Sequence, residues 1–109
     1  MKPIFANPTP LKYSYNPKGD VLYLTFAKEK VAKTFEVLKD WPMVLVDVND
    51  QSQIIGVEYI GVKQFGIEVF MRLLRERVKN LFGVELTDEE VGSFMLFLKT
   101  PEAELALAS

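Results

Sequence analysis

Three acidic residues lie beside predicted strands and could take part in chemistry: Asp20, Asp47 and Glu58. Asp47 and Glu58 flank a short turn at residues 49–52, so they would be near neighbours if the two strands pair. A pair of carboxylates can hold Mg²⁺ or Ca²⁺, or share a proton in acid–base catalysis. Carboxylates at strand ends and on solvated strand faces are also common without such a role. We favour this second interpretation, and predict neither a metal site nor a catalytic residue.

The chain contains no histidine and no cysteine. It therefore lacks the commonest general base, the commonest metal ligand and any thiol nucleophile. The patterns G-x-x-x-x-G-K-S/T, G-x-G-x-x-G and G-x-S-x-G are absent as well. Acid–base catalysis would have to use Asp, Glu, Lys or Tyr alone, and we predict no cofactor.

Two groups of side chains could contact a nucleic acid. The first predicted hairpin carries an aromatic group that could stack on bases, namely Tyr13, Tyr15, Tyr23 and Phe26. A predicted helix carries a basic group that could contact phosphates, namely Arg72, Arg75, Arg77 and Lys79. Cross-strand aromatic packing and a mixed-charge helix surface explain the same residues more simply. The net charge of −2 and the isoelectric point of about 5.2 also argue against nucleic-acid binding.

Short strands would position most of these side chains. Aromatic and β-branched runs that alternate in polarity predict strands at residues 12–15, 20–27, 34–38, 42–48 and 53–60. Side chains alternate along a strand, so one apolar face would hold Val44, Val46, Val48, Ile55, Val57 and Tyr59. The turns are too short for parallel crossovers, which predicts an antiparallel β-meander of four to five strands.

The apolar spacing changes to three and four residues after Gly61. This spacing predicts one face of a helix between Gly66 and Gly83, formed by Ile67, Phe70, Met71, Leu74, Val78 and Leu81. Thr87 and Glu90 have the spacing of a capping box, which predicts a second helix from about residue 88 to about residue 99.

These elements predict one α+β domain over residues 1–109. Its parts are an extended arm at 1–11, a β-meander at 12–62, two C-terminal helices packed on the sheet within 66–99, and a tail at 100–109.

The predicted sheet has a second apolar face. Two short helices can cover one face of such a sheet but hardly both, and an uncovered apolar face would exceed the patches of most monomers. The second predicted helix also contains a segment that is apolar all round. We therefore expect a homodimer, unless the arm and the tail cover the second face. The residues expected in self-association are Met43, Leu45, Ile54, Ile60, Phe94 and Phe97.

Several short motifs in the first part of the chain form a recognisable pattern: Tyr15-Asn16-Pro17, Asp20, Leu22-Tyr23-Leu24, Val31-Ala32, the strand Val44–Asp47, and Ile55-Gly56-Val57-Glu58. With these motifs, this part of the chain resembles a family of small domains of unknown function, DUF2283. Asn16 stands where the family usually has Asp, and Gln53 stands where it often has Gly or Glu. The resemblance covers roughly the first 60 residues. It implies a small antiparallel sheet and brings no established activity, cofactor or catalytic residue.

We predict a non-enzymatic structural or protein-interaction domain that forms a homodimer. One alternative is a regulator with a small-ligand pocket between sheet and helices, lined by Tyr23, Asp47, Glu58 and Phe70. Another is a weak enzyme that uses Asp47 and Glu58. No apolar run approaches the ~20 residues of a membrane span, and the N-terminus does not resemble a secretory signal. We therefore expect a cytoplasmic protein without a membrane partner.

Overall fold

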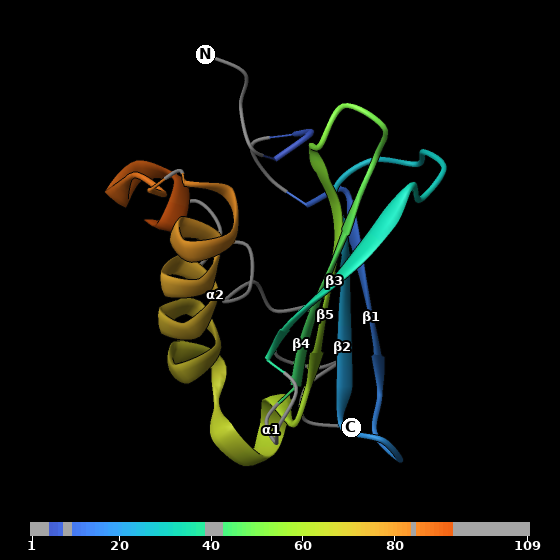
Figure 1. Cartoon of the computed structure of the whole chain (residues 1–109). Coiled ribbons are helices and arrows are strands. Elements are labelled where there is room, and N and C mark those ends of the chain that lie inside the picture. Colours follow the sequence, from blue (N-terminus) through green and yellow to red (C-terminus); the bar gives the residue numbers. More distant parts are fainter. Residues whose placement is uncertain (1–4, 8–9, 39–42, 84, 93–109) are drawn as a thin grey trace.

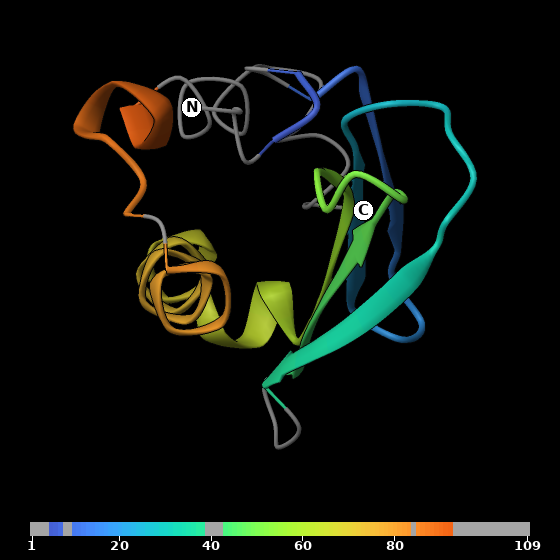
Figure 2. The same ribbon diagram turned by 45° about the horizontal axis from the view of Figure 1, so that its top comes forward.

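The computed structural model describes residues 5–7, 10–38, 43–83 and 85–92 of the chain. One antiparallel sheet carries helices on one of its faces (Figures 1 and 2). Its strands are β1 (Lys12–Asn16), β2 (Val21–Thr25), β3 (Lys33–Leu38), β4 (Met43–Val48) and β5 (Ile54–Ile60). The short helix α1 (Val62–Phe65) and the longer helix α2 (Ile67–Phe82) follow the sheet. This arrangement confirms the predicted α+β class.

The strand order is β1-β2-β5-β4-β3, which differs from a simple meander. Each neighbouring pair is antiparallel, but β5 lies between β2 and β4, and β3 forms the far edge. The link at residues 26–32 must cross three strand spacings, about 14 Å, which an extended segment of this length can span.

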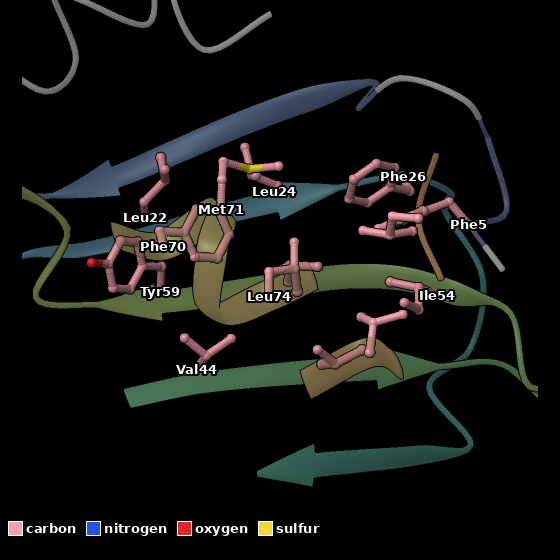
Figure 3. Packing of buried hydrophobic residues seen from close by; sticks show 14 of the residues in the cluster. Phe5, Leu22, Leu24, Phe26, Val44, Ile54, Tyr59, Phe70, Met71 and Leu74 are labelled. Carbon is pink, nitrogen blue, oxygen red and sulfur yellow. The ribbon is translucent and has the colours of Figure 1, made fainter. Parts of the chain in front are cut away.

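The inner face of the sheet, which we define as the face toward α2, forms the core. The six residues predicted for the apolar face of β4 and β5 are all buried, and Leu22 and Leu24 of β2 join them. From α2, the core receives Phe70, Met71, Leu74 and Val78, as Figure 3 shows in part. Leu81, predicted on the same helix face, is instead 47 % exposed. Phe82 packs at this end of the helix, edge-to-face on Phe35 of β3, with the ring centroids 5.4 Å apart.

A shift in register between β4 and β5 corrects one predicted position. Asp47 pairs with Gly56, but the next residue, Val48, pairs with Ile54 and skips Ile55. Such a bulge places two residues of one strand against one of its partner. Ile54 and Ile55 are therefore both buried, and the expectation that Ile54 lies on the second face of the sheet is wrong.

The N-terminal arm extends the core beside this bulge. Phe5 is buried, forms a parallel bridge to Ile54, and packs on the Phe26 ring at 4.7 Å between centroids. The neighbouring Ala6 amide donates to the Ile54 carbonyl. Leu11, by contrast, leaves 56 % of its surface exposed. The arm therefore covers the core near the bulge through Phe5.

The predicted capping box is present after α2. The Thr87 amide donates to Glu90 Oε1, and the Glu90 amide donates to Thr87 Oγ1, both at 3.1 Å. Helical structure begins at residue 88 and continues through residue 92. The rest of this predicted helix lies outside the described residues, as do Phe94, Phe97 and the predicted tail.

Candidate functional site on the outer face of the sheet

The outer face of the sheet, opposite α2, has side chains in three rows that cross the strands. The Asp47 row contains Lys12, Thr25, Gly56, Asp47 and Thr34. The Tyr23 row contains Ser14, Tyr23, Glu58, Leu45 and Glu36. The Ile60 row contains Asn16, Val21, Ile60 and Met43. Polar groups thus gather in the first two rows, and apolar groups in the third.

A hydrogen-bonded network centred on Asp47 connects the first two rows. The Tyr23 hydroxyl donates to Asp47 Oδ2 at 2.7 Å, and the Thr34 hydroxyl donates to Asp47 Oδ1 at 2.6 Å. The network reaches from β2, across β5, to β4 and β3. Side chains of three strands are therefore fixed relative to one another on this face.

Gly56 makes the network possible. It lies on β5 between Tyr23 and Asp47, and a Cβ atom at this position would be 2.2 Å from the Tyr23 hydroxyl oxygen and 3.4 Å from Asp47 Oδ2. A glycine inside a strand commonly marks such a close approach. Only the absence of a side chain lets the tyrosine ring reach across β5.

The network presents hydrogen-bond acceptors to its surroundings. Burial, the hydrogen bond to Asp47 and the negative charges of Asp47 and Glu58 raise the pKa of Tyr23 above its usual range, so the hydroxyl keeps its proton. That proton and the proton of Thr34 are both directed at Asp47. The oxygens of the Tyr23 and Thr34 hydroxyls and of the Asp47 carboxylate therefore offer only lone pairs to an incoming group. Glu58 adds a further carboxylate beside Tyr23. This chemistry suits a donor, above all a cation.

The structure brings together three of the four predicted ligand-binding residues. Tyr23, Asp47 and Glu58 share the outer face. Phe70 lies on the opposite side of the sheet, fully buried and stacked on Tyr59 with a centroid distance of 4.4 Å (Figure 3). The pleat directs Tyr23 and Glu58 away from α2, because Leu22, Leu24, Val57 and Tyr59 point toward it. The expected pocket between sheet and helix, lined by all four residues, is not formed.

Sequence reasoning missed two members of the network, Thr34 and Gly56. Thr34 is significant only once β3 and β4 are aligned, because that register places it opposite Asp47. Gly56 did leave a signal, since it is a glycine inside a strand of larger side chains.

The Asp47 network is on the sheet surface and is not part of a described cleft. Among the described residues, no group of three or more acidic side chains could hold a metal ion. A cleft of about 570 Å³ lies among residues 29–32 and 49–50, apart from the network residues. A reaction at Asp47 would thus occur on an open sheet face, where water weakens electrostatic stabilisation of a transition state.

The aromatic group considered for nucleic-acid contact is engaged in packing and hydrogen bonding, and one arginine of the basic group has an ion-pair partner. Tyr13 and Tyr15 pack against the core, and Phe26 is fully buried in it. Arg75 forms an ion pair with Asp88 at 3.1 Å. The aromatic residues of the first hairpin therefore do not form one exposed stacking platform.

The third acidic residue, Asp20, has a structural role at the end of the sheet. Its carboxylate accepts hydrogen bonds from the Tyr15 hydroxyl at 2.8 Å, the Lys63 amide at 2.9 Å and the Gln64 amide at 3.1 Å. It thus caps the first turn of α1 and ties this helix to the β1–β2 turn. Burial alone would raise the pKa of Asp20, but these three hydrogen bonds and the Lys63 charge outweigh it and lower the pKa.

We expect Asp20→Ala to lower the free energy of unfolding at pH 7 by about 0.5–2 kcal/mol, as the loss of a helix cap does. The pKa is lower in the folded state. The carboxylate therefore stabilises the protein above the pKa of an unfolded-chain Asp, about 3.9. That contribution disappears as the pH falls through the folded value. Urea unfolding should therefore show a difference between wild type and variant that shrinks below about pH 4. The exposed Asp50→Ala is the control, and a difference independent of pH would contradict the assignment.

Comparison with known proteins gives a match to one family model and to no individual protein or structure. Residues 12–63 match the model of DUF2283, a family described as a protein of unknown function. The match covers just under half of the chain, and it contains the five strands and every residue of the Asp47 network. No curated protein and no solved structure matches the chain significantly. Within the described residues, no helix is long and apolar enough to cross a membrane.

Proposed function

We propose that the protein is a non-enzymatic interaction domain that forms a homodimer through the five-stranded sheet, whose residues match the DUF2283 model. The observation that carries the proposal is the outer face of the sheet. Both helices labelled in Figure 1 lie on the inner side, and no described helix covers the other side (Figure 2). A sheet face with apolar side chains normally packs against another layer.

The apolar side chains of the outer face support this proposal. Val21, Met43, Leu45 and Ile60 keep part of their surface exposed, and they cluster in and beside the Ile60 row. Full burial of a side chain of this size contributes roughly 1.5–3 kcal/mol. Covering these four residues with a second copy would therefore provide a substantial part of the free energy of association.

Sedimentation equilibrium at micromolar concentration tests the proposal. We expect a particle of about twice the 12.4 kDa of one chain. Dilution should lower the average mass, because dimerisation depends on concentration. A particle of 12.4 kDa over the whole concentration range would overturn the proposed function.

A further inference from the structure

We infer that two copies pack through their outer sheet faces about a two-fold axis that runs along the Ile60 row, so that Glu58 of each copy meets the lysines at the turn end of the other. This inference rests on the proposed homodimer and specifies its surface and its pairing. Three features of the outer face support it: the acceptor chemistry of the Asp47 and Tyr23 rows, the apolar Ile60 row, and a basic end beyond that row.

The first feature calls for a cationic partner. Asp47, Glu58 and Glu36 are acidic, and Lys12 at the β1 edge is the one basic residue in the three rows. The Tyr23 and Thr34 protons are already donated to Asp47. An incoming surface must therefore bring hydrogen-bond donors and positive charge, as lysine side chains do.

The second copy carries suitable groups at the turn end of its own sheet. Lys18 lies in the β1–β2 turn, Lys63 lies in α1, and both side chains are exposed. Asp20 holds these two segments together, since its carbonyl accepts from the Gly61 amide at 2.8 Å and its carboxylate accepts from the Lys63 amide. Along the strand direction, both lysines therefore lie beyond the Ile60 row, at the end opposite Glu58.

Two-fold symmetry connects these features. The proposed axis lies in the plane of the interface and runs along the Ile60 row, perpendicular to the strands. Rotation about it places the residues on one side of this row in one copy over the residues on the other side of the row in the second copy. The apolar row then packs on itself, and Glu58, about 7 Å along β5 from Ile60, faces the basic end of the other copy. An axis parallel to the strands would instead place Glu58 opposite Glu58 if it ran along β5, or opposite Glu36 if it ran along β4, and like charges in contact oppose association. The charge pattern therefore selects the first axis.

Charge reversal with rescue tests this pairing. Glu58→Lys alone, and Lys18→Glu with Lys63→Glu together, should each weaken the dimer at least about tenfold in Kd, because each puts like charges across the interface. An equimolar mixture of the two variants should restore association as a heterodimer. In this heterodimer one Glu58–lysine contact is unchanged, and the other has its two charges exchanged, so both contacts are attractive. Raising NaCl from about 0.05 M to about 0.5 M should weaken the wild-type dimer, because salt screens these pairs.

The controls are reversals on the exposed side of α2, Glu68→Lys and Lys79→Glu, which should leave Kd unchanged. Circular dichroism establishes that each variant is folded, and Glu58→Gln provides a milder change that should weaken the dimer less than Glu58→Lys. If the wild type is a dimer and no charge reversal on the outer face changes the Kd, this inference is overturned and the proposed function still stands. Variants that weaken the dimer but do not recover on mixing would also overturn the pairing. A monomeric wild type would overturn the proposed function itself.

Discussion

Phe70→Ala should lower the free energy of unfolding by about 3–5 kcal/mol, the cost typical of removing a buried aromatic ring from a core. The Phe70 side chain is fully buried, and its ring stacks on Tyr59 at 4.4 Å with an interplanar angle of 19°. Figure 3 shows Phe70 among Leu22, Met71 and Tyr59, between α2 and the sheet. Small domains are stable by only about 5–15 kcal/mol, so this one change would remove a large share of the total.

Leu81→Ala on the same helix is the matched control, because Leu81 is 47 % exposed. We expect it to change the free energy of unfolding by at most about 0.5–1 kcal/mol, since an exposed side chain loses little on truncation. Urea titration followed by circular dichroism measures both variants. A Phe70→Ala protein as stable as Leu81→Ala would contradict the core assignment and return Phe70 to the ligand-binding role that its sequence context also allowed.

The faces of the strands could be predicted because alternation is a local property. Val44, Val46 and Val48 share one face wherever β4 lies in the sheet, and burial follows from the polarity of the pattern. The strand order could not be predicted in this way. Nothing within β2 or β3 states that they are separated by β5 and β4, because that order depends on the path of the link at residues 26–32.

Ile54 shows the same limit at the scale of one residue. Strict alternation places it on the other face from Ile55, but with the register shift beside Val48 both side chains are buried and Ile54 joins the core. A bulge depends on how two strands pair, so neither strand alone reveals it.

Only part of the candidate site could be predicted from the sequence, and the reason is related. Tyr23, Asp47 and Glu58 stood out as polar or aromatic residues near strands, which single residues can show. Their common face depends on register, and so does the separation from Phe70. Thr34 and Gly56 gained a role only when cross-strand neighbours were known. Local pattern therefore identifies the reactive side chains, and pairing decides which of them meet.

Gly56→Ala should have the second large effect, a loss of about 1–3 kcal/mol in the free energy of unfolding, as for overpacking of a well-packed site. The new methyl carbon would lie 2.2 Å from the Tyr23 hydroxyl oxygen and 2.9 Å from Cζ of its ring, so the side chain must swing away. The hydrogen bond to Asp47 is then broken, and a bond to a charged acceptor contributes about 1.5–3 kcal/mol. The usual gain from replacing a strand glycine, roughly 0.5–1 kcal/mol, offsets only part of this loss.

A double-mutant cycle separates the contact with Tyr23 from a general intolerance of alanine at this position. In a Tyr23→Thr background the colliding hydroxyl and ring are gone, so Gly56→Ala should become neutral or slightly stabilising. Gly92→Ala is the control, because a Cβ there meets nothing within 4 Å. Equal losses in both backgrounds would show that Gly56 is required for another reason. A loss confined to the Tyr23 background would instead establish that glycine is needed there because two side chains from β2 and β4 meet above it.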